Sequence, residues 1–247
     1  MTDGMVSIKN FSMAKNIEVL FPTYVYRSSL AGSRRLNSRL EGEIIGMLDH
    51  DKVGLKWSRG HYRKGYTSFG SSQQLHKTSE TFSELMTQIR PHVDKFLKQL
   101  RWQIAPQELQ VSNCWANAMG RGSRHPMHTH PRCMISGVYY INAPKGSAPF
   151  VVEDPRTDFY MAVPMRAAGA PRRDQRQVAL QPRAGDLILF ESWLKHEVPE
   201  HFAKEPRLSV AFNFSELMTE VTPDSALDSQ SKVRRLRHKR VLNDSSL

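Results

Sequence analysis

The strongest chemical signal in the chain is a group of three histidines within six residues, His125, His128 and His130. His128 and His130 are two positions apart, and in an extended backbone such residues point to the same face, so both imidazoles can reach one ion. Pro126 and Pro131 flank the pair and disfavour helix at the residues before them, which argues against the i, i+4 helical arrangement of zinc proteases. The stretch therefore predicts two ligands of a metal site.

A third ligand must come from elsewhere in the chain, and His196 is the best candidate. It follows residues 185–190, Gly-Asp-Leu-Ile-Leu-Phe, which indicate a turn and a buried strand, so His196 is expected at a strand end. Eleven residues later, Arg207 opens the segment Arg-Leu-Ser-Val-Ala-Phe-Asn-Phe, in which Arg207 and Ser209 share one strand face. An arginine there can hold a carboxylate through two parallel hydrogen bonds.

These motifs resemble a known family. The ordered set is similar to the Fe(II)/2-oxoglutarate-dependent oxygenases of the jelly-roll superfamily, most of all to a poorly characterised group of 2OG-Fe(II) oxygenases. His-Glu-Val at 196–198, with an arginine about ten residues on, also resembles the prolyl hydroxylase branch. The resemblance extends from about Val19 to Phe214. The motifs that carry it are His128-x-His130, Ser136-Gly-Val-Tyr-Tyr-Ile-Asn142, Phe190-Glu-Ser-Trp-Leu-Lys-His196-Glu-Val and Arg207-x-Ser209.

The resemblance implies an α+β fold, a double-stranded β-helix (a jelly-roll, cupin-like core) with N-terminal packing helices. It implies an oxidoreductase that uses Fe(II) and 2-oxoglutarate to hydroxylate, or otherwise oxidise, an unactivated C–H bond, with release of succinate and CO₂. Hydroxylation, halogenation, desaturation and ring closure share the same first steps, so the motifs do not separate them. The residues assigned to the metal are His128, His130 and His196, and those assigned to 2-oxoglutarate are Arg207, Ser209, Tyr140 and Asn117.

The sequence departs from the superfamily at position 130, where an aspartate or glutamate is usual and this chain has histidine. Three neutral imidazoles leave more positive charge on the metal, and imidazole suits iron, zinc and copper alike, so the identity of the metal is less certain. Two other arrangements remain open. In the first, a water binds the metal in place of His130, and His130 contacts that water and not the metal. In the second, Glu153 or Asp154 completes the ligand set.

Two other functions also remain open. Three-histidine iron sites in cupins carry out dioxygenase chemistry without 2-oxoglutarate, although the Arg207-x-Ser209 motif argues against this function. The other function belongs to a different class of protein, a non-enzymatic basic jelly-roll module that binds nucleic acid or another acidic partner. Its histidines would hold structural zinc or be vestigial.

Length and composition predict one domain. The 247 residues suffice for one substantial core, and a loosely ordered segment at 1–15, a domain at 16–220 and a tail at 221–247 are expected. No apolar run reaches the roughly 18 residues that span a bilayer, and no signal segment is evident, so a cytoplasmic location and no membrane partner are expected. Cys114 and Cys133 are expected in core strands, without a disulfide.

The net charge of +11 comes partly from the tail, in which six basic residues lie between Lys232 and Arg240. Such a run is usually a solvated tail, so nucleic-acid binding is not favoured. The expected partner is a small-molecule or peptide substrate. The charge also permits an acidic substrate, and a homodimer is left open.

The pattern of apolar residues predicts the elements that position these side chains. Helices are expected at 33–49 and 79–102, and Pro91 is expected to bend or divide the second. Strands are expected at 17–26, 109–119, 134–141, 187–190 and 208–214, while 49–77 and most of 143–184 are expected to be loops. His201 is expected to face solvent. Candidates for substrate contact are Trp115, Arg156 and Arg166, with Arg172 and Arg173 nearby.

Overall fold

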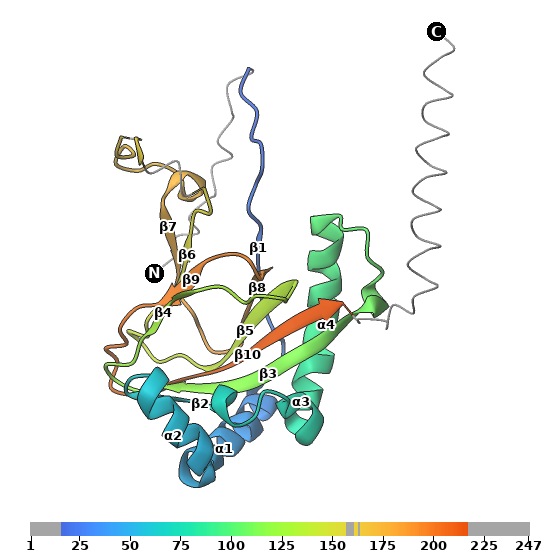
Figure 1. Ribbon diagram of the computed structural model, residues 1–247, viewed down its shortest axis with the longest axis vertical. Coiled ribbons are helices and arrows are strands. Elements are labelled where there is room, and N and C mark those ends of the chain that lie inside the picture. The colour runs from blue at the N-terminus through green and yellow to red at the C-terminus, as the bar shows by residue number, and fades with distance from the viewer. Residues whose placement is uncertain (1–15, 157–160, 163, 217–247) are drawn as a thin grey trace, which may run out of the picture.

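The computed structural model describes residues 16–156, 161–162 and 164–216 (Figure 1). The expected N-terminal segment at 1–15 and the whole of the expected basic tail at 221–247 lie outside these residues. The helices are α1 (Arg34–His50), α2 (Lys52–His61), α3 (Leu75–Thr78) and α4 (Glu80–Leu100). The strands are β1 (Val25–Ser29), β2 (Gly65–Thr67), β3 (Leu109–Met119), β4 (His125–His128), β5 (Ile135–Asn142), β6 (Phe150–Glu153), β7 (Gln177–Leu180), β8 (Asp186–Glu191), β9 (His196–Val198) and β10 (Arg207–Glu216).

The strands form two antiparallel sheets. The larger has the order β1-β8-β5-β10-β3-β2 and the smaller the order β4-β9-β6-β7. Neighbouring strands in each sheet are mostly distant in sequence, as in a double-stranded β-helix, and the two sheets face each other across one core (Figure 1). The expected α+β fold with a jelly-roll core is therefore confirmed.

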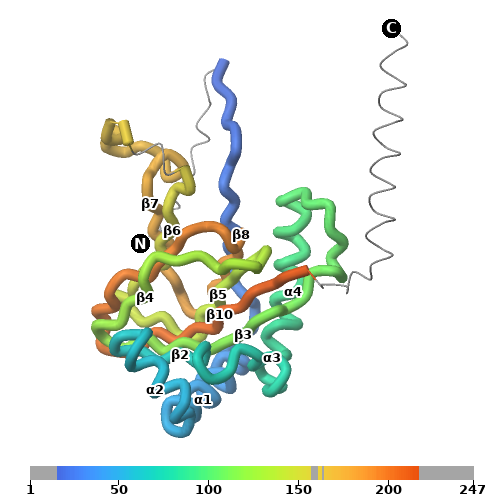
Figure 2. The backbone as a smooth tube through the Cα atoms, viewed as in Figure 1, coloured from blue at the N-terminus to red at the C-terminus, as the bar shows by residue number. Residues whose placement is uncertain are grey.

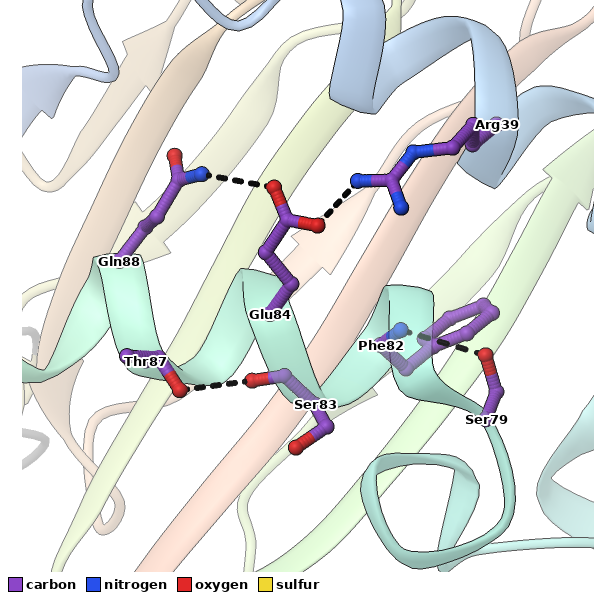
Figure 3. Close-up of polar contacts among 7 residues, drawn as sticks. All are labelled: Arg39, Ser79, Phe82, Ser83, Glu84, Thr87 and Gln88. Carbon is purple, nitrogen blue, oxygen red and sulfur yellow. Dashed lines mark hydrogen bonds and ion pairs between the residues drawn. The ribbon is translucent and has the colours of Figure 1, made fainter.

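Helices α1 and α4 cover the outer face of the larger sheet. Their apolar faces, which include Leu40, Ile44, Phe82 and Ile89, are fully buried against strand residues such as Phe212. At the start of α4, Ser79 accepts a hydrogen bond from the backbone N–H of Phe82, which satisfies a free donor of the first turn (Figure 3). An ion pair between Arg39 and Glu84 links the two helices (Figure 3). Both expected helices are confirmed, and α4 runs unbroken through Pro91.

Alternation along the strands separates the two sides of the larger sheet. On β5, Tyr139 and Ile141 face the helices, whereas Val138 and Tyr140 face the smaller sheet. Gly137 lies on the helix side, where an added Cβ would come within 2.3 Å of the Phe212 ring. The expected inward face of β5 is confirmed, and the same alternation turns Arg207, Ser209 and Asn213 of β10 inward.

Two expected loops contain regular structure. Residues 49–77 were expected to be irregular but hold α2, β2 and α3. The side chain of Asp51 explains the start of α2, because it accepts hydrogen bonds from the backbone N–H of Gly54 and from the hydroxyls of Tyr66 and Ser71. The segment is thus fixed by contacts between distant residues, which periodicity does not reveal.

The segment 143–184, most of which was expected to be loop, contains the two strands β6 and β7. The two pair in a hairpin that projects from the barrel, as the backbone tube shows (Figure 2). β7 is short and has only one buried residue, Leu180, so its sequence gives little signal.

Three further expectations can be compared with the structure. The strand expected at 17–26 begins only at Val25, and Ile17 to Phe21 are exposed. Cys114 lies in β3 as expected, whereas Cys133 lies in the turn before β5, and both are free thiols. None of the described helices is long and apolar enough to span a membrane.

Candidate metal centre

Three imidazoles from two strands and a turn converge at one end of the barrel. His128 ends β4 and pairs in register with His196, the first residue of β9. His130 lies two residues beyond β4, where its backbone N–H donates to the carbonyl of Ser192. One ring nitrogen of each histidine lies within 4.8 Å of the other two, and the Nε2 atoms of His128 and His130 are 3.2 Å apart.

The other ring nitrogen of each histidine is held by an oxygen atom. Nδ1 of His128 lies 2.8 Å from the carbonyl oxygen of Pro126, and Nδ1 of His196 lies 2.9 Å from that of Leu194. A carbonyl oxygen can only accept, so Nδ1 of both rings carries the proton and donates it. Their Nε2 atoms are therefore free to bind a metal, in the arrangement in which an oxygen orients a ligand histidine.

Nδ1 of His130 is held by two inward-facing strand residues. It lies 2.7 Å from both the Ser136 hydroxyl and Oδ1 of Asn213, and the Ser136 hydroxyl also donates to that oxygen. With Nδ1 donating to Asn213, Nε2 of His130 also lacks a proton. Two unprotonated nitrogens 3.2 Å apart repel each other unless a cation lies between them. The spacing matches the ~3.0 Å between adjacent ligands at right angles, each ~2.1 Å from one ion.

The environment keeps all three rings neutral, which metal binding requires. Burial lowers the pKa of His196 to about 2 and that of His130 to about 4, and it also lowers the pKa of His128. Phe190 and Phe150 pack against His196, with ring centroids 4.6 and 5.1 Å away. The arrangement fits a divalent metal with imidazole ligands and open positions on its far side.

Neither carboxylate alternative fits the structure. Val152 faces the core between the sheets, so Glu153, the next residue of β6, points to the outside of the barrel. Asp154 pairs with Arg156 instead. Among the described residues, the only group of three metal-binding side chains within reach of one another is the histidine triad, so the structure does not support the alternative in which Glu153 or Asp154 completes the site.

A fourth histidine, His125, lies beside this group but is not part of it. Its ring packs against that of His128, with centroids 4.1 Å apart, and edge-on against Tyr62 at 5.2 Å. Burial lowers its pKa to about 3, so it too is neutral. His125 therefore packs between His128 and Tyr62.

Arg207 is buried in the barrel with only 3% of its surface exposed. One nitrogen of the guanidinium donates to the carbonyl of Ala148, and the group lies 5.2 Å from the centre of the Tyr140 ring. Within the described part of the chain, neither Nε of Arg207 nor the Tyr140 hydroxyl has a hydrogen-bond partner, and no carboxylate pairs with the guanidinium. A buried cation beside an unpartnered hydroxyl fits a ligand carboxylate.

The other predicted cofactor-binding residues surround Arg207. Ser209 pairs in register with Asn117 on one side and with Tyr140 on the other, and all three are buried. Burial raises the pKa of the Tyr140 hydroxyl, which therefore stays protonated and able to donate. The structure thus brings together all four residues that the sequence assigned to the cofactor.

His201 was expected to face solvent, and that expectation was wrong. The residue has no exposed surface. Its Nδ1 accepts a hydrogen bond from the backbone N–H of Ala148, and its Nε2 donates to the carbonyl of Glu205. Because the carbonyl of Ala148 is the acceptor for Arg207, His201 holds the residue that orients the guanidinium.

His128 and His130 line a cavity of about 390 Å³. Trp115, a predicted substrate-contact residue, lines it. Arg156 and Arg166 do not line it, and their guanidinium groups bind Asp154 and the carbonyl of Asp174. The cavity is also lined by Trp57, Tyr62 and Phe69 from the segment 49–77, which was expected to be a loop. The aromatic residues in that segment were the signal that could have identified it.

Comparison with known proteins agrees with this geometry. Residues 113–213 match the model of a family described as "Putative 2OG-Fe(II) oxygenase". All of the metal and cofactor residues predicted from the sequence lie within the matching segment. No curated protein matches the chain.

Several solved structures share the fold at low sequence identity. A Pseudomonas putida prolyl-4-hydroxylase is 15% identical, with 78% of this chain and 94% of that chain covered and a TM-score of 0.53. HygX from Streptomyces hygroscopicus, solved with nickel and 2-oxoglutarate bound, is 11% identical over 80% and 84%, with a TM-score of 0.52. The non-heme alpha ketoglutarate dependent epimerase SnoN from nogalamycin biosynthesis is 14% identical over 79% and 77%, with a TM-score of 0.55.

Residues 113–213 thus match a 2OG-Fe(II) oxygenase family model, and the solved structures share the fold of the chain. The resemblance inferred from the ordered histidine and arginine motifs is confirmed.

Proposed function

We propose that the protein is a dioxygenase that depends on Fe(II) and 2-oxoglutarate and oxidises a C–H bond of a small-molecule substrate, with release of succinate and CO₂. The observation that carries the proposal is the triad itself. Nε2 of His128, His130 and His196 is free for a metal because an oxygen atom holds Nδ1 of each ring.

The residues of the chain have three tasks in this reaction. The triad would hold the metal through the three Nε2 atoms and leave room for 2-oxoglutarate and O₂ to bind it. When bound, the iron and 2-oxoglutarate supply the oxidising chemistry, in which decarboxylation of the ketoacid is coupled to oxidation of the substrate. Phe150 and Phe190 keep water from the inner side of His196, and Trp115 borders the space for the substrate.

Arg207 would bind the far carboxylate of 2-oxoglutarate. The unpartnered Nε of Arg207 and the unpartnered hydroxyl of Tyr140 are both available as donors to this anion. Ser209 and Asn117 are its buried neighbours and can donate further hydrogen bonds. Binding the carboxylate would neutralise the guanidinium, which has no carboxylate partner among the described residues.

The test is a stoichiometric assay of metal binding and 2-oxoglutarate turnover. Wild-type protein with Fe(II) should release succinate from 2-oxoglutarate, slowly without substrate and faster with one. His196→Ala should lose both the metal and the turnover. Arg207→Ala should keep the metal and need far more 2-oxoglutarate. Trp193→Ala, a change at an exposed residue, is the control and should behave as wild type. If the wild type releases no succinate, either alone or with any of the substrates tested, the proposal is refuted.

The all-histidine ligand set favours one alternative, a metal dioxygenase that does not use 2-oxoglutarate. The same assay separates the two functions, because that enzyme would consume O₂ with a substrate and release no succinate. The unpartnered buried guanidinium of Arg207 supports the 2-oxoglutarate enzyme. A peptide substrate, a cytoplasmic location and a homodimer stay predictions from the sequence alone.

A further inference from the structure

We propose that the substrate is a small, neutral compound with a planar ring that presents hydrogen-bond acceptors to the protein. The inference rests on the proposed function for the position of the metal and for the direction of the hydrogen bonds described below. It goes further by naming the chemical class that the cavity beside His130 accepts.

The first argument is a continuous wall of rings that leads from the surface to the metal ligands. Trp57 of α2 and Phe69 have centroids 6.0 Å apart, and Phe69 meets Trp115 edge-to-face at 5.2 Å. Trp115 in turn meets His130 at 5.8 Å. A planar ring that enters the cavity can stack on this wall or meet it edge-on, whereas a saturated ring gains only the contact area.

Trp57 is held in place by its surroundings. Its indole stacks on His61, with centroids 4.3 Å apart and an interplanar angle of 13°. It also lies directly over Gly70, where an added Cβ would come within 2.2 Å of the indole. Phe69, by contrast, is 37% exposed, so part of its ring is free to contact a ligand.

The second argument is the charge of the cavity. Among the described residues that line it, none is lysine, arginine, aspartate or glutamate. The net charge of +11 therefore does not extend to this surface. An ionised substrate would lose its hydration here and find no charged side chain as a partner, which is unfavourable. The acidic substrate that the overall charge permits is thus disfavoured at this site.

The third argument is a chain of amides that starts at the metal ligand. Oδ1 of Asn213 accepts from Nδ1 of His130, and Nδ2 of Asn213 lies 3.4 Å from Oδ1 of Asn113. Nδ2 of Asn113 donates in turn to Oε1 of Gln73 at 3.2 Å. Each amide oxygen in this chain is already an acceptor. The chain ends at Gln73, whose Nε2 amide is left as an N–H donor to a ligand in the cavity.

Metal binding fixes this direction. When Nε2 of His130 binds the metal, Nδ1 must carry the proton, so Asn213 must accept and each following amide must donate outward. The wall of rings and the row of donors border the same cavity. Its volume of about 390 Å³ lies at the small end of ligand pockets, which fits a compound of one or two rings.

The experiment measures the binding of three matched probes by calorimetry. Coumarin is planar, neutral and has only acceptors. Octahydrocoumarin keeps the lactone without the aromatic ring, and coumarin-3-carboxylate keeps the ring and adds a negative charge. Full-length protein is titrated metal-free, and again with Fe(II) and 2-oxoglutarate without O₂. Coumarin should bind about threefold to tenfold more tightly than octahydrocoumarin and coumarin-3-carboxylate. Equal binding of all three, tightest binding of the anion, or no binding of any would overturn the inference.

Variants place the bound probe. Trp57→Ala should weaken coumarin about fivefold or more and change octahydrocoumarin less. Phe69→Ala is a second variant that should still fold, because the ring belongs to the wall but lies largely outside the core. It should also lower the affinity for coumarin. Gln73→Glu replaces donors with acceptors and should also weaken coumarin. Trp193→Ala removes an exposed indole that does not line the cavity and should change nothing. Unchanged coumarin affinity in all three cavity variants would refute the assignment.

The outcomes also separate this inference from the proposed function. If wild-type protein releases succinate from 2-oxoglutarate but coumarin does not bind preferentially, the substrate class is wrong and the oxygenase stands. If coumarin binds preferentially at the cavity but no succinate is released with any substrate, the proposed function fails and the ring-binding site stands.

Discussion

Replacing Arg207 with methionine should weaken 2-oxoglutarate binding without destabilising the protein. Methionine fills the space of the apolar stem and removes the charge. A guanidinium that binds a carboxylate with two charge-assisted hydrogen bonds contributes about 1.5–3 kcal/mol through each. The expected loss of about 3–6 kcal/mol corresponds to a rise of about 100-fold or more in the 2-oxoglutarate concentration at half-maximal rate.

Stability should respond differently. In the ligand-free protein the guanidinium is buried without a carboxylate partner, and its hydrogen bond in this structure goes to the carbonyl of Ala148. Loss of that bond costs about 1 kcal/mol, and relief of the buried charge offsets it. The melting temperature of ligand-free Arg207→Met should therefore stay within about 2–4 °C of wild type.

Arg90 provides the matched control. It pairs with Asp94 and donates to the backbone carbonyls of Leu109 and Pro106, far along the chain from the triad. Arg90→Met should lower the melting temperature by several degrees and leave the 2-oxoglutarate requirement unchanged. Succinate release is measured against 2-oxoglutarate concentration, and unfolding by calorimetry. An Arg207→Met protein that unfolds much earlier than wild type, with an unchanged 2-oxoglutarate requirement, would mean that the guanidinium is structural.

Three further predictions address residues that support the site. Asn213→Leu removes the acceptor for Nδ1 of His130 and should weaken Fe(II) binding about 10- to 100-fold, as measured by metal titration, while an unchanged affinity would contradict the assigned role. His201→Phe removes the hydrogen bond that holds Ala148 and should raise the 2-oxoglutarate requirement several-fold at unchanged metal affinity; equal loss of both would indicate a general packing defect. Asp51→Ala removes the cap of α2 and should cost about 1–2 kcal/mol of stability at neutral pH. Burial raises the pKa of Asp51, but the hydrogen bonds to its carboxylate, led by that from Ser71, together lower the pKa by more. The net pKa of Asp51 therefore lies below its ordinary value. The stabilisation by Asp51 is therefore present above about pH 4 and is lost as the pH falls through the lower folded-state pKa. Wild type and Asp51→Ala should converge in stability on acidification. A difference in stability that does not change with pH would refute the linkage.

Much of the barrel and the triad follows from local patterns. Alternation on β5 places Val138 and Tyr140 on the face opposite Tyr139, and the same rule turns Arg207 inward on β10. The two-residue spacing of His128 and His130 brings both rings to one point. Such periods are visible in a sequence because each strand alternates regardless of its partners.

What the sequence missed depends on contacts between distant segments. Helix α2 begins where Asp51 binds Tyr66 and Ser71, which no local period reveals. His201 looked like a loop residue because its partner, Ala148, is 53 positions away. Trp57 belongs to the cavity only because the segment that carries it folds back over the barrel mouth. These three features could be recognised only from the tertiary structure.

The central claim is that three imidazoles bind one ion, and anomalous diffraction from crystals grown with Fe(II) tests it most directly. The account predicts a single strong peak about 2.1 Å from Nε2 of His128, His130 and His196. A peak bound through His125, or a peak at which His130 is replaced by water, would contradict the proposed ligand set.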